Sequence, residues 1–217
     1  MNEKPILFSG EMVKAILDGS KTQTRRIGKI QGNYVGLGVE IVRHATKGHE
    51  AIATHDAYPG RGTARHGIEH CRFGVPGDRL WVKETFSIKG ICHAMKPSEA
   101  AKYASKNAWI YAADGATGWK WKPSIFMPRA ASRIALEITG VRVERLQDIS
   151  RGDCMAEGCP FPNIAMSQPN FTDPKKWYSE LWESINGKGS WDANPWVWVV
   201  AFKKISNGEL SDGKKNV

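Results

Sequence analysis

The order of the predicted strands and helices is the feature that most constrains how this chain can fold. Alternating apolar and polar residues predict strands over 79–86 and 132–143, and a short strand is predicted over 109–112. The threonine-rich segment 21–27 is predicted to be a strand or an extended exit from a turn. A nearly continuous apolar stretch over 196–205 predicts a further strand in the interior of a sheet. Helices come irregularly among these strands, without a βαβ rhythm. This order favours an α+β fold in which helices pack on a small curved sheet or barrel.

Start and stop signals predict the main helices. A residue that caps a helix precedes each apolar periodic segment, and a residue that ends a helix follows it. These pairs are Ser9 and Gly19, Ser150 and Gly158, and Asp173-Pro174 and Asn186-Gly187. Asp153 follows Ser150 at the spacing of a capping box. A further short helix is predicted over 98–105.

Length and composition favour one domain. The chain has 217 residues, of which 41% are hydrophobic and 24% charged, so it resembles an average globular protein and can bury a core. We expect a single domain over 1–205, with long insertions at about 28–76 and 87–122, and a flexible tail over 206–217. The first insertion holds five of the six histidines and one short predicted strand, 39–42.

The cysteines and histidines do not follow a known metal or disulfide pattern. The residue types that bind zinc gather loosely, at spacings that match no standard site; they are His66, His70, Cys71, Cys92 and His93. The sequence therefore predicts no metal and no cofactor. Four cysteines are too few for a disulfide framework, no apolar run could span a bilayer, and the N-terminal segment lacks an export signal. We expect a cytoplasmic protein without membrane contact.

The charge balance points to an anionic partner. Lys and Arg number 31 against 22 acidic residues, which gives a net charge of +9. A surface of this kind attracts polyanions, and nucleic acid is the first candidate. The alternative is a basic globular protein that has no such partner.

The turn after the first predicted helix concentrates polar chemistry. After Gly19, the segment 20–26 (SKTQTRR) contains an ammonium group, two threonine hydroxyls and two guanidinium groups. Such a turn can direct backbone N–H groups and cations at an anion; the alternative is a solvated basic strand. The chain has no Walker loop, no GxGxxG after a strand, no HExxH and no GxSxG.

Segment 16–26 (ILDGSKTQTRR) resembles the GxKxxxxR-type signature of ASCH domains, the activating-signal-cointegrator homology family. Further segments are similar to the longer branch of this family, which is common in phages and prophages. They are 76–84 (PGDRLWVKE), 123–129 (PSIFMPR), 141–150 (VRVERLQDIS) and the final Trp-rich strand. Together they cover about half of the chain, in the order found in the family.

The resemblance implies a small β-barrel similar to the PUA domain, with a cleft that holds RNA. It also implies an activity, because some compact members are amidohydrolases that remove the acetyl group from N4-acetylcytidine. Their catalytic Lys, Thr and Glu match Lys21, Thr24 and Glu157, the last with a gap of one residue. This chain is longer than those enzymes.

These three residue types suit amide hydrolysis, which needs a nucleophile, a proton acceptor and a group that stabilises an oxyanion. Thr24 offers the hydroxyl. Lys21 is the base if burial or a cationic neighbour lowers its pKa; a charged Lys21 would instead stabilise the oxyanion, and Glu157 or water would take the proton. In a regular strand Lys21 and Thr24 point to opposite faces, so they converge only if the turn extends past Lys21 or the strand is bulged.

Several cations and aromatic residues are candidates to contact RNA, DNA or a modified nucleoside. They are Arg25, Arg26, Trp119, Trp121, Lys122 and Arg129. Trp177, Trp182, Trp196 and Trp198 fall in apolar segments and are expected in the core, whereas Trp81 fits either role. A non-catalytic RNA- or DNA-binding module and a ribonuclease that uses the same cleft are the alternatives to the hydrolase. The oligomeric state does not follow from the sequence.

Overall fold

A computed structural model describes residues 2–28, 38–44, 48–56, 63–90, 94–160 and 173–205, with only the backbone between 38 and 70. The chain divides into two compact units. Unit 1 comprises Met1–Gly19, Gly77–Glu137 and Lys203–Val217, and unit 2 comprises Ser20–Pro76 and Ile138–Phe202.

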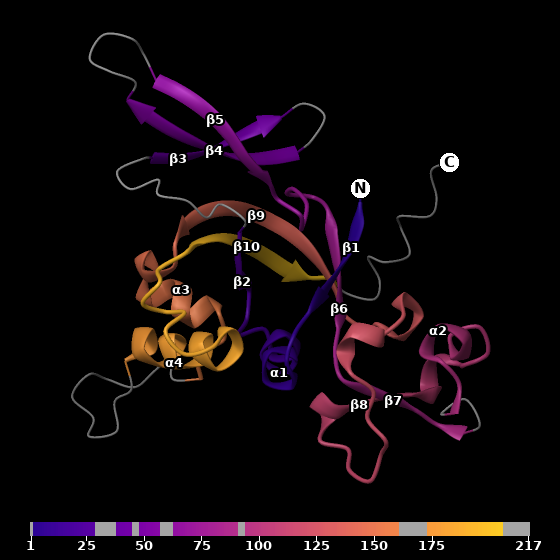
Figure 1. Cartoon of the computed structure of the whole chain (residues 1–217). Helices are drawn as coiled ribbons and strands as arrows, with labels where there is room; N and C mark the ends of the chain where they lie inside the picture. The colour runs from indigo at the N-terminus through magenta and orange to yellow at the C-terminus, as the bar shows by residue number, and fades with distance from the viewer. Residues whose placement is uncertain are drawn as a thin grey trace. The chain divides into compact units, whose positions relative to one another are not determined.

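The largest sheet has five strands in the order β1-β6-β9-β10-β2 (Figure 1). Their bounds are β1 Glu3–Leu7, β2 Gln23–Ile27, β6 Arg79–Lys83, β9 Ala135–Arg145 and β10 Trp196–Lys204. β1 pairs with β6 in parallel, whereas β6 pairs with β9 and β10 pairs with β2 in antiparallel orientation. Together with the helices below, this mixed sheet confirms the predicted α+β class, and the interior position of β10 agrees with its apolar sequence.

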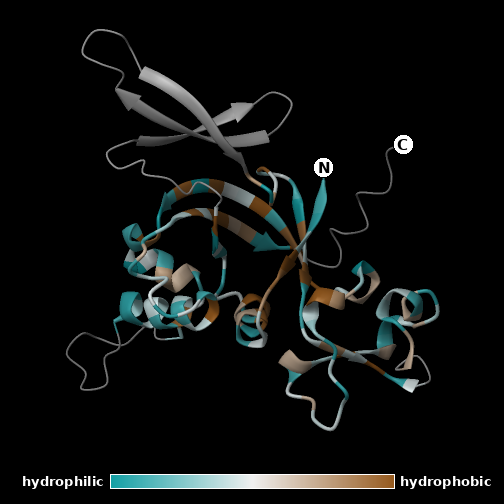
Figure 2. Ribbon diagram, viewed as in Figure 1, coloured by the Kyte–Doolittle hydropathy of each residue, from teal (hydrophilic) through white to brown (hydrophobic). Residues whose placement is uncertain are grey.

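Unit 1 contains the first predicted helix, α1 (Gly10–Asp18). Ser9 Oγ accepts a hydrogen bond from the backbone N–H of Met12, and Gly19 ends the helix in the left-handed conformation with φ of 86°. Val13 and Ile16 are buried, and Figure 2 shows hydrophobic residues within this helix. The cap, the apolar face and the glycine therefore act as predicted.

The strand predicted over 79–86 is interrupted in unit 1. β6 ends at Lys83, and Phe86–Ile88 forms β7, which pairs with β8 (Trp109–Tyr111). Between β6 and β7 lies Glu84, a buried residue whose carboxylate receives two hydrogen bonds from Arg133, at 2.9 and 3.0 Å. Because this buried charge is held by a residue distant in sequence, the alternation of apolar residues did not reveal the break.

Short helices connect the remaining elements. The helix predicted over 98–105 is confined to α2, Pro97–Ala100. After it, Lys102 and Tyr103 donate backbone hydrogen bonds to Glu99 and Ala100, three residues back, so the chain tightens into turns. The described 3₁₀ helices include Lys106–Ala108, Ala112–Asp114, Ser124–Phe126, Arg129–Ala131 and Leu146–Asp148.

Unit 2 contains the two other predicted helices. α3 spans Arg151–Ala156 and begins with the predicted capping box, and α4 spans Pro174–Asn186 and is followed by Gly187. Their buried side chains pack with those of β10; the cluster comprises Leu146, Ile149, Cys154, Tyr178, Trp182, Val197 and Val199. Both helices are thus fixed by their caps and by one apolar face.

The first insertion contains more strands than the sequence indicates. β3 (Gly38–His44), β4 (Gly48–Asp56) and β5 (Thr63–His70) form an antiparallel three-stranded sheet, where only one short strand was expected. Pairing between neighbouring strands satisfies backbone groups even where apolar alternation is weak, which explains the missed strands. The tail over 206–217 and the segment 91–93 lie outside the described residues. In the part of the chain that is described, no helix is long and apolar enough to span a bilayer.

Candidate functional site

Lys21 and Glu157 form a buried ion pair in unit 2. Lys21 Nζ donates to Glu157 Oε2 at 2.6 Å and to the Glu157 backbone oxygen at 2.9 Å, although the two residues are 136 positions apart. Their side chains are 0% and 2% exposed. The left-handed turn at Gly19 leads the chain to Lys21, and Glu157 stands at the C-terminal end of α3. Their backbones also form a β-bridge, so both ends of the pair are held by main-chain structure.

Arg25 supplies a second cation to the same carboxylate. Its Nη1 donates to Glu157 Oε1 at 3.1 Å, so each oxygen of Glu157 has its own cationic partner. Arg25 also donates to Glu144 through Nε, at 3.0 Å, and through Nη2, and this Nη2 lies 3.4 Å from Asp153 Oδ2. The Arg25 side chain is 0% exposed, so carboxylates of the protein take the place of water around its positive charge.

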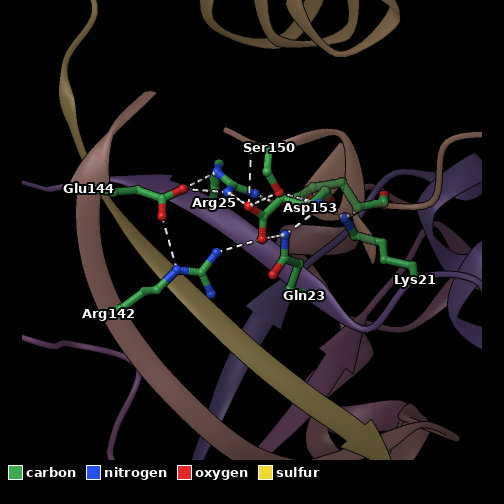
Figure 3. A network of polar contacts seen from close by, with 8 residues as sticks. Lys21, Gln23, Arg25, Arg142, Glu144, Ser150 and Asp153 are labelled. Atoms are coloured by element: carbon green, nitrogen blue, oxygen red, sulfur yellow. Dashed lines mark hydrogen bonds and ion pairs between the residues drawn. The ribbon is translucent and has the colours of Figure 1, made fainter. Parts of the chain in front are cut away.

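A second layer of polar groups surrounds Arg25 (Figure 3). Arg142 donates to Glu144 Oε2 at 2.9 Å and to Asp153 Oδ1 at 2.6 Å. Gln23 Nε2 donates to Asp153 Oδ1 at 3.0 Å, and the Ser150 hydroxyl donates to Asp153 Oδ2 at 2.6 Å. We call the six charged residues the ionic cluster; they are Lys21, Arg25, Arg142, Glu144, Asp153 and Glu157. It balances three cations with three carboxylates, which buried charges require.

The surroundings of Lys21 favour its neutral form. Burial lowers the pKa of the Lys21 ammonium; the charge of Glu157 opposes this effect, and the guanidinium groups of Arg26 and Arg25 add to it. Burial and cationic neighbours are the two conditions under which a lysine acts as a base near neutral pH. A titratable group perturbed in this way is a marker of functional sites.

Thr24 occupies a different position from the other two proposed catalytic residues. It is 2% exposed and lies in β2 between Gln23 and Arg25, whose side chains contact the ionic cluster. Side chains alternate along a strand, so Thr24 points to the opposite face of β2. No hydrogen bond joins its hydroxyl to Lys21 or Glu157 among the described residues. The structure thus joins Lys21 and Glu157 and places Thr24 within β2, three residues after Lys21.

The residues expected to contact nucleic acid fall into both units. Arg25 and Arg26 belong to unit 2, where Arg25 is enclosed by the ionic cluster and burial lowers the pKa of Arg26. Trp119, Trp121, Lys122 and Arg129 belong to unit 1. Trp119 is 39% exposed. Arg129 donates two hydrogen bonds to Glu3, at 2.9 and 2.7 Å, and its Cζ lies 5.9 Å from the centre of the Trp81 ring.

Sequence reasoning missed the partners that complete the site. Glu144 and Arg142 alternate in the segment VRVER, a signal for charges on one face of a strand, but nothing in it indicates their partners. Tyr178 of α4 is a further residue at the site that was not singled out from the sequence. Its buried ring centre lies 5.9 Å from Arg25 Cζ, and burial together with the charge of Glu157 raises the pKa of its phenol well above 10.0. Cys154 is buried beside it, and burial raises the pKa of that thiol to about 12.

Metal binding is not indicated in the ranges that the structure describes. No three His, Cys, Asp or Glu side chains are grouped there as metal ligands. The carboxylates of the ionic cluster are instead occupied by lysine and arginine. The side chains of His66, His70, Cys92 and His93 lie outside the described residues.

Comparison of the chain with protein-family models, with curated proteins and with solved structures finds no match.

The ionic cluster predicts a sensitivity to acid. Burial raises the pKa of Asp153, but hydrogen bonds from Ser150 and Gln23 and the charge of Arg25 outweigh it and lower this pKa below 3.8. A carboxylate whose pKa is lower in the folded than in the unfolded state stabilises the fold above its unfolded pKa, and this stabilisation is lost as the pH falls. We expect the free energy of unfolding to decline from about pH 5 to about pH 2, and to decline less steeply in Asp153→Asn.

Urea unfolding at a series of pH values measures this dependence. Asp148→Asn is the matched control, because Asp148 is an exposed aspartate close in sequence. Equal slopes for Asp153→Asn and the wild type would contradict the assignment.

Proposed function

We propose that this protein is an ASCH-type amidohydrolase that removes the acyl group from an N4-acylated cytosine nucleoside, using Lys21, Thr24 and Glu157. The observation that carries the proposal is the buried contact of 2.6 Å between Lys21 and Glu157. The resemblance singled out these two residues from segments far apart in the chain, and a buried lysine with a lowered pKa suits proton transfer. The finer fold that we propose, a PUA-like barrel, is compatible with the curved five-stranded sheet and its packed helices.

The proposed reaction begins with the neutral amine of Lys21. It takes the proton of the Thr24 hydroxyl while Oγ1 attacks the acyl carbonyl carbon. The C–N bond then breaks, the Lys21 ammonium returns the proton to N4 of the leaving cytosine, and the acyl group remains on Thr24 as an ester. Lys21 then takes a proton from water as the water oxygen attacks the ester carbonyl carbon. The C–O bond to Thr24 breaks, the Lys21 ammonium returns the proton to Thr24 Oγ1, and the carboxylic acid is released. Glu157 orients Lys21 and stabilises its charged form between the two transfers.

The mechanism requires Thr24 Oγ1 to come within hydrogen-bond reach of Lys21 Nζ when substrate is bound. Because Thr24 faces away from the side chains of Gln23 and Arg25, the start of β2 has to rearrange locally to form this contact. Thr24→Val removes the hydroxyl and keeps the shape of the side chain. We expect it to reduce kcat/KM by at least about 100-fold. Thr22→Val is the matched control, because Thr22 is the exposed threonine two residues earlier.

The assay follows the conversion of N4-acetylcytidine to cytidine by liquid chromatography, with the full chain as enzyme. Cytidine release by the wild type and by Thr22→Val, but not by Thr24→Val, supports the proposal. No release by the wild type would overturn the hydrolase, and full activity of Thr24→Val would remove Thr24 from the mechanism.

We propose, as a second candidate, a nucleic-acid-binding module without catalysis. The net charge of +9 and the exposed Trp119 and Arg129 of unit 1 favour it. Phosphate contacts release counterions, so affinity for single-stranded RNA or DNA is expected to fall steeply with salt. Fluorescence anisotropy at several salt concentrations measures this dependence, and Trp119→Ala with Arg129→Ala tests whether unit 1 contributes.

A further inference from the structure

We propose that Arg25 is a positioning residue, which holds Glu157 through one carboxylate oxygen so that Lys21 receives only the other. The two oxygens of the Glu157 carboxylate bind different cations. Arg25 Nη1 lies 3.1 Å from Oε1, and Lys21 Nζ lies 2.6 Å from Oε2. This inference rests on the proposed function, because it assigns Arg25 a role in the same site. It replaces the contact with nucleic acid that the sequence suggested for this arginine.

Arg25 is itself fixed from several directions. Its backbone pairs with Val199 of β10 in the sheet, and its guanidinium contacts Glu144 and Asp153 in addition to Glu157. A guanidinium is planar, stays charged at all relevant pH values, and presents donors in several fixed directions. One side chain can therefore bind three carboxylates at once, and Glu157 is restrained by the whole ionic cluster.

The division of Glu157 matters for the proton on Lys21. A carboxylate that binds a lysine alone stabilises its ammonium form strongly, which would make the lysine a poor base. Arg25 takes up one oxygen of Glu157. Burial lowers the pKa of Lys21 most, and the charges of Arg26 and then Arg25 lower it further. Both effects favour the neutral amine that accepts the threonine proton. Removing Arg25 should therefore shift the titration of Lys21 to higher pH.

The chain offers a matched control for this effect. Arg142 contacts Glu144 and Asp153, as Arg25 does, but within the described part of the chain it makes no ion pair with Glu157. Loss of either arginine leaves carboxylates of the ionic cluster with one fewer cation, so both variants are expected to lose stability. Only loss of Arg25 changes the partners of Glu157, so a shift of the Lys21 titration separates positioning from a merely structural role.

The experiment compares the wild type with Arg25→Met, Arg25→Lys and Arg142→Met, each as the full chain. The first readout is kcat/KM for N4-acetylcytidine as a function of pH. The second is the titration of Lys21 by NMR of ¹³C-labelled lysine, with the signal assigned from Lys21→Met. In Arg25→Met we expect the midpoint of the acidic limb of the pH profile, and the midpoint of the Lys21 titration, to move to higher pH by about one unit. At a fixed pH on that limb, kcat/KM should therefore be about tenfold lower than in the wild type. Arg25→Lys keeps the positive charge but has a single ammonium group in place of the planar guanidinium. The Lys21 titration in this variant should move in the same direction by a smaller amount.

The outcomes are separable. Arg25→Met with the wild-type limb and the wild-type Lys21 titration overturns the inference, as does an equal shift in Arg142→Met. If Arg25→Met does not fold, Arg25→Lys carries the test, and a wild-type titration in that variant overturns the inference. If the wild type releases no cytidine, the hydrolase proposal fails while the NMR titration still decides the role of Arg25.

Discussion

Glu157→Ala is expected to lower the free energy of unfolding by about 3–5 kcal/mol, which is typical when one partner of a buried ion pair is removed. The wild-type carboxylate binds Lys21 and Arg25, whose side chains are both 0% exposed. Without it, Lys21 loses the carboxylate that lies 2.6 Å from its ammonium, and Arg25 loses one of its three carboxylate partners. Chemical denaturation followed by circular dichroism and tryptophan fluorescence measures the change.

Glu11→Ala is the control for this prediction. Glu11 pairs with Lys14 at 2.9 Å on the surface of α1, where its side chain is 85% exposed. Exposed pairs contribute little, so this variant should stay within about 0.5 kcal/mol of the wild type. If Glu157→Ala is no less stable than Glu11→Ala, the buried ion pair does not form in solution.

Lys21→Met is expected to lower kcat/KM for N4-acetylcytidine by at least about 100-fold, the lower range for loss of a general base. Methionine keeps an unbranched chain of similar length but offers no nitrogen to accept the threonine proton. The stability loss should be smaller than in Glu157→Ala, because Arg25 still binds Glu157 Oε1. Liquid chromatography of the cytidine product, together with denaturant unfolding of the same samples, measures both effects.

Lys14→Met controls for the loss of a lysine as such, because Lys14 lies on the surface of α1 with a side chain that is 51% exposed. It should keep wild-type turnover. Turnover by Lys21→Met at the wild-type rate would exclude Lys21 as the base, whatever the stability of the variant.

Features that depend on neighbours in the chain were predicted well. Ser9 and Gly19 delimit α1, Ser150 and Asp153 form the capping box of α3, and Asp173 caps α4. Each of these interactions joins residues within about four positions, so the residue types alone reveal them. The apolar stretch that became β10 was recognised for the same reason.

Features that depend on distant partners were not predicted. Glu84 interrupts a strand because Arg133 holds its carboxylate, and the three strands of the first insertion form by pairing with one another. The resemblance to ASCH domains named Lys21 and Glu157 but not Glu144, Arg142 or Asp153. Arg25 was expected to contact nucleic acid, and its three carboxylate partners did not follow from the sequence.

By itself, the amino-acid sequence determined the ends of the helices, the apolar strand and the basic charge of this protein. Capping and apolar periodicity depend on residues close together in the chain, and the net charge depends only on composition. Only the tertiary structure decided which charges neutralise one another. Lys21 and Glu157 are 136 positions apart, and they meet because β2 pairs with β10 while α3 packs in the same unit. A buried cation is stable only beside its carboxylate, so the fold that joins them also defines the candidate site.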